Sequence, residues 1–339
     1  MKHQTTRYGE IPFYKIGTFG NTADAFISKK LFLEYKTKYS FPKKGDILIS
    51  ASGTIGRAVI YDGKPAYFQD SNIVWIDNDE TLVKNDFLFY AYSNVKWNTE
   101  HTTILRLYND NFRNTLIPLP PLNKQSAIAN ILSGLDRYLC ALDALILKKE
   151  GVKKALSFEL LSQRKRLKGF NQAWQRVRLG DIANYLTSNL SVEQITQQGK
   201  IKVYDVNNFI GYTDTTFISD KPYISIVKDG SVGRVRILPP KTNILSTMGA
   251  LIANHRTTTE FLFYLLSNFD FKNFTSGSII PHIYFKDYKE KTIFLPPLNE
   301  QSTIANILSA LDNEIISLKN KKRQFEDIKK ALNHDFSEC

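Results

Sequence analysis

The sequence has little cysteine and no long apolar run. Two cysteines, Cys140 and Cys339, occur among 339 residues, which excludes a disulfide framework and a four-thiolate zinc site and favours a reducing compartment. No stretch reaches the roughly 18 consecutive apolar residues that a membrane-spanning helix needs, and the first residues show no apolar core of signal-peptide length. We therefore expect a cytoplasmic protein with no membrane partner.

The common catalytic motifs are also missing. No Gly-x4-Gly-Lys-[Ser/Thr] phosphate loop occurs, so the chain should not be an ATP-driven translocase. None of the Pro-Pro pairs has the Asn/Asp-Pro-Pro-aromatic form that methylation of an adenine amino group calls for. The histidines have no metal-ligand spacing with each other or with cysteine; they are His3, His101, His255, His282 and His334. We expect a non-catalytic chain without cofactor or metal.

One enzymatic alternative stays open. The carboxylates Asp70, Asp77 and Asp79, near Trp75, could hold Mg²⁺ in a nuclease that acts alone. A turn of solvated acidic residues is the commoner origin of such a cluster, so this alternative ranks second.

Basic residues outnumber acidic ones. Lys and Arg number 45 against 33 Asp and Glu, which gives a net charge of +12 and a pI near 9.4. Because basic side chains gain free energy by displacing counterions from phosphates, a nucleic acid is the favoured partner over a chance excess of charge on a scaffold protein. The hydrophobic fraction of 42% and the length favour a folded chain of two domains.

An internal repeat organises the chain. Residues 119–136 read LPPLNKQSAIANILSGLD and residues 295–312 read LPPLNEQSTIANILSALD, with 15 of 18 positions identical at an offset of 176. Upstream, FLFYAYSN at 87–94 matches FLFYLLSN at 261–268, and SGTIGR at 52–57 matches DGSVGR at 229–234. Each half is therefore a variable domain followed by a nearly constant segment.

The repeat is incomplete at one place. IPFYKI at 11–16 matches IKVYDV at 201–206 more loosely, at an offset of 190, which places Met1 opposite about Ser191. The stretch WQRVRLGDIANYL at 174–186 then has no counterpart in the first half. The sequence predicts an amino terminus that is shortened or is completed from elsewhere.

The constant segments predict two long helices. Each follows a Pro-Pro pair that cannot continue a helix backwards, and Asn123 and Asn299 are the expected N-caps. The first helix would run over 123–168, with Gly151 as its weak point. The apolar stripe that would form a coiled-coil seam consists of Ile128, Leu132, Leu135, Leu142, Leu156, Ile304, Leu308, Leu311, Leu318, Ile328 and Leu332. The alternative is that each helix packs only on its own domain.

The variable domains are predicted to be α+β with a strand-rich core. Residues 45–76 and 221–240 are dense in β-branched and aromatic residues broken by Gly turns, and 87–94 and 261–268 read as short helices packed on the sheet. The predicted boundaries are 1–118 and 170–294 for the variable domains and 119–169 and 295–339 for the helices.

These features resemble the specificity (S) subunit of type I DNA restriction-modification enzymes. The resemblance covers essentially the whole chain and is carried by the duplicated LPPLNKQ/LPPLNEQ, by LGDI at 179–182 and by the GTIG and GSVG turns. The departures are the missing first-half partner of WQRVRLGDI and a second helix without a counterpart of the basic QRKRLKGF at 163–170.

The resemblance implies a reader of DNA rather than a catalyst. Each variable domain would be a target recognition domain for one half of a split sequence of double-stranded DNA. The two helices would form an antiparallel coiled-coil spacer with pseudo-twofold symmetry. Two modification subunits, which carry the S-adenosylmethionine site and methylate adenine, would dock on this scaffold, and restriction subunits would join them.

Candidate DNA-contacting residues are polar or basic side chains on the loops of the variable domains. In the first domain they are Lys43, Lys44, Thr54, Arg57, Arg106, Tyr108, Asn109, Asn111 and Arg113. In the second they are Ser231, Arg234, Arg236, Lys272, His282, Tyr284 and Lys286.

The repeat ranks these candidates. Arg57 and Arg234 occupy equivalent positions, so a phosphate contact or a structural ion pair is favoured there over base specificity. The glycines of the GTIG and GSVG turns are expected to shape tight turns rather than touch DNA. Specificity should concentrate where the halves differ, at LRLYNDNFR (105–113) against PHIYFKDYK (281–289).

Overall fold

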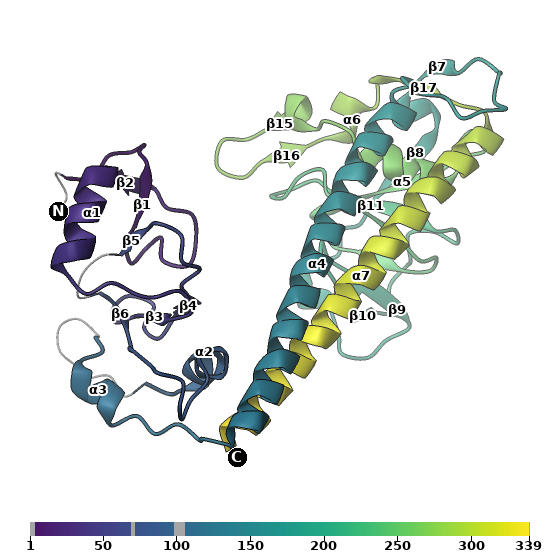
Figure 1. Cartoon of the computed structure of the whole chain (residues 1–339). Coiled ribbons are helices and arrows are strands. Elements are labelled where there is room, and N and C mark those ends of the chain that lie inside the picture. Colours follow the sequence, from purple (N-terminus) through teal and green to yellow (C-terminus); the bar gives the residue numbers. More distant parts are fainter. Residues whose placement is uncertain (1–3, 69–71, 98–105, 339) are drawn as a thin grey trace. The chain divides into compact units, whose positions relative to one another are not determined.

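The chain consists of two compact units. The computed structural model describes residues 4–68, 72–97 and 106–338, with the backbone alone for 335–338. Unit 1 comprises residues 1–143 and 320–339, and unit 2 comprises 144–319. Each unit therefore combines one variable domain with a segment of each long helix (Figure 1).

Unit 1 contains two three-stranded sheets, with strand orders β2-β1-β5 and β4-β3-β6. The central strand β3 is apolar throughout because both of its faces are covered: Ile47, Leu48 and Ile49 are at most 2% exposed. The elements before the first long helix are β1 (Ile11–Tyr14), β2 (Ala25–Ile27), α1 (Lys29–Lys38), β3 (Ile47–Ser50), β4 (Ala58–Ile60), β5 (Tyr67–Phe68), β6 (Ile73–Trp75), α2 (Asn85–Asn94) and α3 (Asn109–Arg113).

Unit 2 repeats both sheets and adds the strand β8 to one of them. Its sheets have the orders β10-β9-β13 and β12-β11-β14-β8, and two further pairs are β15-β16 and β17-β7. The elements are β7 (Gln175–Arg178), β8 (Ala183–Thr187), β9 (Ile201–Tyr204), β10 (Phe209–Thr213), β11 (Tyr223–Val227), β12 (Val235–Leu238), β13 (Asn243–Ile244), β14 (Met248–Ala253), α5 (Thr259–Ser267), β15 (Thr275–Ser276), β16 (His282–Ile283), α6 (Phe285–Tyr288) and β17 (Thr292–Leu295).

The loose repeat near the start is confirmed by topology. β1 and β9 are the two segments that align at an offset of 190, and each is the central strand of a three-stranded sheet. Each pairs antiparallel with the next strand and parallel with a later one, β5 or β13. The predicted α+β architecture with a strand-rich core is therefore present in both units.

The long helices are α4 (Leu122–Leu161) and α7 (Leu298–Glu338). Both begin one residue before the predicted N-caps, so Asn123 and Asn299 were wrong as caps. The carbonyls of Pro121 and Pro297 accept the first helical bonds, from Gln125 and Gln301. Each asparagine instead accepts the N–H of the following residue on its Oδ1 at 2.9 Å. α4 continues through Gly151 and ends at Leu161, short of the predicted 168.

α4 and α7 are joined by the same lysine–aspartate ion pair in both units. In unit 1 the lysine lies on α7, and in unit 2 it lies on α4. In unit 1, Lys329 on α7 pairs with Asp136 on α4, and in unit 2 Lys153 on α4 pairs with Asp312 on α7. Because 329 and 153, like 312 and 136, differ by the repeat offset, each pair is the copy of the other. Each aspartate also accepts a tyrosine hydroxyl of the adjacent short helix, from Tyr90 at 2.9 Å or Tyr264 at 2.8 Å.

The pairing runs antiparallel within each unit. In unit 1, Asp143 follows Asp136 on α4, while its partner Lys322, at 2.6 Å, precedes Lys329 on α7. In unit 2 the same order holds, and Figure 1 shows these segments of α4 and α7 side by side with α5. Ion pairs therefore join the two helices in antiparallel order within each unit, in agreement with the predicted spacer.

The predicted seam residues are mostly buried, with one correction. Leu132, Leu142, Ile304 and Leu308 are at most 5% exposed. The half-buried members are Ile128, Leu135, Leu156, Leu311, Leu318 and Leu332. Ile328 is 47% exposed and was wrong as a seam residue, because the adjacent Lys329 turns toward α4 in its place.

Each long helix also packs on the variable domain that precedes it, as the alternative predicted. At the start of each helix, Leu132 packs on α2 and Leu308 packs in the core that contains α5. The opposite helix joins the same clusters, through Leu332 in unit 1 and Leu160 in unit 2. Each variable domain is therefore braced by both helices.

Reversing one charge of the seam should destabilise unit 1. Lys329→Glu places two carboxylates together at Asp136 and should lower the free energy of unfolding by about 1 kcal/mol, measured by amide hydrogen exchange in α2 and α4. Lys330→Glu, an exposed neighbour, is the matched control. The double variant Asp136→Lys/Lys329→Glu should recover part of the loss, and an unchanged loss would contradict the pairing.

Burial of tyrosine predicts a stability loss at alkaline pH. Tyr223 is fully buried beside the Thr242 hydroxyl at 3.0 Å, and burial raises its pKa to about 12. Since the folded-state pKa is raised, the stabilisation is complete below the unfolded pKa of about 10 and is lost as pH rises toward 12, by about 3 kcal/mol. Tyr223→Phe should flatten this decline in urea unfolding between pH 9 and 12, whereas Tyr8→Phe, at an exposed position, should not.

Candidate nucleic-acid interface

In each unit the two segments singled out from the sequence lie beside each other. The loop after β3 meets the later segment at the bridge between Ser52 and Arg106, and the loop after β11 does so between Asp229 and His282. The Leu107 N–H donates to the Ala51 carbonyl at 2.8 Å, which ties the segments of unit 1 together. Segments more than fifty residues apart thus form one surface, once in each unit.

The glycines of these loops shape turns, as predicted. Gly53, Gly56, Gly230 and Gly233 all have φ between 67° and 84°, a region that other residues rarely adopt. Gly233 also lies under the ring of Phe271, where a Cβ would meet ring carbon at 2.6 Å. These turns are held by backbone shape and close packing.

Three predicted arginines are tied to neighbouring loops. Arg57 donates to the Phe19 carbonyl at 2.9 Å, and its repeat counterpart Arg234 donates to the Asn207 side chain at 2.9 Å. Arg236 donates to the Asn207 carbonyl at 2.9 Å and lies over the Tyr204 ring. The bonds of Arg57 and Arg234 thus join them to neutral groups, and the preference for a phosphate contact over base specificity stays a prediction for both.

The second segment of unit 2 carries a fixed histidine. Nδ1 of His282 lies 2.6 Å from the Asp229 carboxylate. Because an ionised carboxylate only accepts hydrogen bonds, Nδ1 of His282 donates in this contact, and Nε2 takes no part in it. Tyr284 stacks on this ring, is 50% exposed, and has the Lys286 ammonium 5.5 Å from its own centroid.

The predicted DNA-contacting residues in segment 105–113 of unit 1 differ in burial and in partners. Asn111 is 8% exposed and accepts the Tyr108 N–H at 2.6 Å, so its side chain caps α3 and is not available to a groove. Arg106 lies 5.8 Å from the Tyr108 ring centroid, and Arg113 pairs with Asp110 at 3.6 Å. The sequence could not show that Asn111 points inward.

The remaining candidates lie on the surface of their units. Lys43 pairs with Asp77 at 3.0 Å, and this hydrogen bond raises its pKa. The others are exposed side chains: Lys44, Thr54, Asn109, Ser231 and Lys272.

The surface has no metal centre within the described residues. No group of three or more His, Cys, Asp and Glu side chains among them could hold a metal ion. Of the predicted nuclease carboxylates, Asp70 lies outside the described residues, Asp77 pairs with Lys43, and Asp79 binds the Thr81 hydroxyl at 2.7 Å.

Two glutamines that the sequence analysis passed over anchor the long helices. The fully buried Gln301 donates to the carbonyls of Arg256 and Pro296 and accepts from the Thr257 hydroxyl and the Thr258 N–H, all between 2.8 and 3.0 Å. Gln125 makes the same kind of bonds in unit 1, to Leu82, Lys84 and Pro120. Their identity in both copies of the repeat was the available signal.

Comparison with known proteins identifies the family. Residues 1–149 and 171–326 match the sequence model of the type I restriction modification DNA specificity domain. The chain belongs to this family. The two matches coincide with the two halves of the repeat, which agrees with one such domain at the centre of each unit.

Specificity proteins resemble the chain in sequence. It is 64% identical over 137 residues to the putative type I restriction enzyme specificity subunit S.HindORF215P of Haemophilus influenzae, covering 40% of this chain and 36% of that protein. It is 27% identical over 326 residues to the putative type I restriction enzyme MjaX specificity subunit of Methanocaldococcus jannaschii, covering 85% of this chain and 76% of that protein.

Solved structures share the fold. The type I restriction-modification S subunit of M. genitalium matches with a TM-score of 0.67 at 20% identity, over 99% of this chain and 91% of that one. A chain from a study of complex assembly and conformational transition of the type I R-M system matches with a TM-score of 0.54 at 16% identity, over 87% and 82%. No helix within the described residues combines the length and apolarity needed to cross a membrane.

Proposed function

We propose that this chain reads a two-part sequence of double-stranded DNA, with one reader in each unit, and that it scaffolds catalytic subunits without acting on DNA itself. The observation that carries the proposal is the duplicated surface: the same pair of segments meets in both units, while their exposed residues differ. Two equal scaffolds with unlike surfaces suit a target of two unlike halves.

The roles of the residues follow from their accessibility. Contact with bases falls to His282, whose Nε2 takes no part in the bond to Asp229, and to the exposed Tyr284. Phosphate contact falls to Lys286, Lys272 and Lys44, which are exposed. In unit 1, Arg106 and Tyr108 hold the place equivalent to His282 and Tyr284.

The paired helices are the docking surface of the proposed catalytic subunits. The nearly identical segments 119–136 and 295–312 would offer the same surface to two modification subunits, with restriction subunits joining them. The domain boundaries 1–118, 119–169, 170–294 and 295–339 belong to this proposal, as does a cytoplasmic location.

The test is to reconstitute the chain with its modification subunits and S-adenosylmethionine and to sequence the methylated DNA. The expected result is a single split motif that requires this chain. Exchange of residues 188–286 for those of a related reader should change one half of the motif and leave the other intact. Hydrolysis of DNA by the chain with Mg²⁺ alone would favour a nuclease, and failure to retain duplex DNA at low salt with the subunits present would favour a scaffold of other function.

Replacing a phosphate-binding lysine should act uniformly on DNA sequences. Lys286→Ala is expected to weaken binding of specific and unrelated duplexes by a similar factor and to reduce the slope of log K against log salt by about 0.9, in fluorescence titrations of the reconstituted complex. Lys148→Ala, an exposed residue of α4, serves as the control. A loss confined to the specific duplex would assign Lys286 to base reading instead.

A further inference from the structure

Two loops outside the predicted DNA-contacting segments contact the GTIG and GSVG turns. In unit 1 the loop 15–24 joins β1 to β2, and in unit 2 the loop 205–208 joins β9 to β10. Each accepts a hydrogen bond from the arginine that follows its glycine turn. Arg57 donates to a carbonyl of the first loop and Arg234 to the Asn207 side chain of the second, both at 2.9 Å. Because the two arginines are repeat counterparts, an equivalent third segment meets the glycine turn in both units.

In unit 2 the GSVG turn connects this loop to the segment that carries His282. Near the start of the turn, the Gly230 N–H donates to the Pro281 carbonyl at 2.9 Å. At its end, Arg234 is bonded to the loop 205–208. Three segments that lie far apart along the chain therefore meet at one turn, and two of them already belong to the proposed DNA surface.

The loop 205–208 is fixed by its own hydrogen bonds. The Asp205 carboxylate accepts the N–H groups of Asn207 and Asn208 at 2.8 and 2.6 Å, and the Asp205 N–H donates to the Asn208 carbonyl at 3.0 Å. Arg236 adds a bond to the Asn207 carbonyl at 2.9 Å. A loop held in this way loses little conformational entropy when it binds a partner.

The cations next to this loop favour a polyanion as that partner. Arg234 and Arg236 donate to neutral oxygens of Asn207, so their charge is not neutralised by a carboxylate in these bonds. Lys202, exposed on β9, has its ammonium 6.0 Å from the centroid of the Phe209 ring, which directly follows the loop. The field of these three cations attracts the phosphates of DNA.

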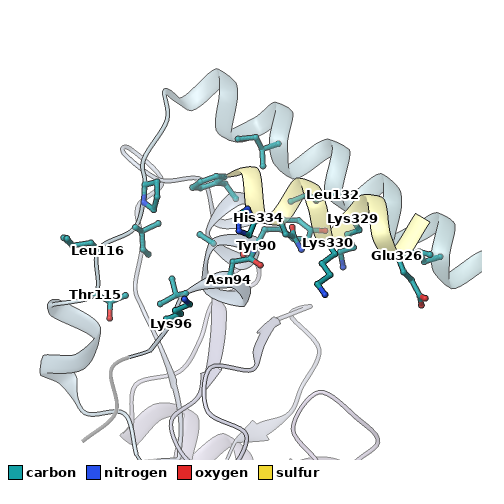
Figure 2. A pocket seen from close by; sticks show the side chains of 18 of the residues that line it. Tyr90, Asn94, Lys96, Thr115, Leu116, Leu132, Glu326, Lys329, Lys330 and His334 are labelled. Carbon is teal, nitrogen blue, oxygen red and sulfur yellow. Dashed lines mark hydrogen bonds between the residues drawn. The ribbon is translucent and has the colours of Figure 1, made fainter. Parts of the chain in front are cut away.

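The third loop differs in length between the units, with ten residues in unit 1 and four in unit 2. In unit 1, α2 and the long helices enclose a cavity of about 1080 Å³ (Figure 2). None of the described residues that line this cavity belongs to the loop 15–24. The loop can therefore vary without disturbing that part of the helix packing, as expected of a segment that reads a different sequence in each unit.

Asn208 is the side chain of the loop 205–208 that is best suited to read a base. It is exposed, whereas the side-chain oxygen of Asn207 is already bonded to Arg234. An asparagine amide can donate to N7 of adenine and accept from its N6 amino group at the same time. In the major groove this pairing distinguishes adenine from the other three bases.

We propose that the loop 205–208 is a third part of the DNA-reading surface of unit 2 and that Asn208 contacts an adenine in the half-site of this unit. Arg234 is a positioning residue that holds the loop against the glycine turn. The inference rests on the proposed function, because it assigns a further specificity-determining residue to the same reader.

The test is Asn208→Ala in the complex reconstituted with modification subunits and S-adenosylmethionine. Exchange of residues 188–286 first identifies the half of the methylated motif that unit 2 reads. We expect Asn208→Ala to remove the requirement for adenine at one position of that half and to leave the other half unchanged. In fluorescence titrations, the preference for the specific duplex over one with that A·T pair replaced should fall about tenfold.

Two further variants control this result. Alanine fits the backbone at Asn208, because this residue lies outside the left-handed region. Asn184→Ala, at an exposed asparagine on β8, at the opposite edge of the sheet from β12, should leave the motif intact. Arg234→Ala should reduce the same preference between the two duplexes, and combining it with Asn208→Ala should add little, because both changes remove one contact.

The outcomes separate this inference from the proposed function. A motif that Asn208→Ala leaves unchanged, or an equal loss of affinity for specific and unrelated duplexes, would overturn the role of Asn208 while the two-part reader stands. If the unaltered chain directed no methylated motif at all, both the inference and the proposed function would be overturned.

Discussion

Gln301→Leu is expected to destabilise unit 2 by about 3–5 kcal/mol. Leucine matches the size of glutamine but leaves two carbonyls, a hydroxyl and an N–H without partners in a fully buried site, and each unsatisfied group costs about 1–3 kcal/mol. Because the chain has two units, amide hydrogen exchange in α5 and β11 is the suitable measurement.

The control for this prediction lies on the same helix. Gln324→Leu, at an exposed position of α7, should change stability by less than about 0.5 kcal/mol. If both variants behaved alike, the buried bonds of Gln301 would not anchor α7. The expected loss also predicts that Gln301→Leu will disturb the docking surface proposed at 295–312.

Gly233→Ala is expected to destabilise unit 2 by about 2–5 kcal/mol and to disturb its proposed DNA surface. A methyl group there meets the Phe271 ring at 2.6 Å, and φ of 80° is strained for any residue with a Cβ. Both effects can be followed by hydrogen exchange in β11 and by DNA retention of the reconstituted complex.

Gly230→Ala is the control that has the backbone strain of Gly233→Ala but not its steric clash with Phe271. This glycine lies in the same turn with φ of 84°, but nothing lies within 4 Å of the added methyl group. Its cost should be about 1 kcal/mol, the backbone strain alone. Equal effects of the two substitutions would show that Phe271 moves aside and that close packing does not hold the turn.

The sequence predicted elements that depend on local periodicity. The helical stripe of the constant segments, the Gly turns and the density of β-branched and aromatic residues in 45–76 are all visible within a few residues, and the structure has helices, turns and short strands there. Errors arose at boundaries. The helices begin after Pro121 and Pro297 and not after Asn123 and Asn299. The carbonyls of these prolines accept the first helical hydrogen bonds, and no asparagine side chain caps the helices.

The candidate site was only partly predictable. Exposure of Tyr284 and Lys286 agrees with the proposed interface, but Asn111 turned out to be a cap, and Arg57 is bonded to the Phe19 carbonyl. Polar side chains of loops can form hydrogen bonds either to water or to backbone groups, and the sequence does not show which of the two partners each side chain has.

By itself, the sequence determined that this protein is a duplication of a variable α+β domain and a nearly constant long helix, with a basic charge suited to DNA. Only the tertiary structure decided that Gln125 and Gln301 bind the helices to the domains and that Lys329 rather than Ile328 faces α4. The reason is that these contacts join atoms far apart along the chain, where burial and hydrogen-bond satisfaction, and not local propensity, select the partner.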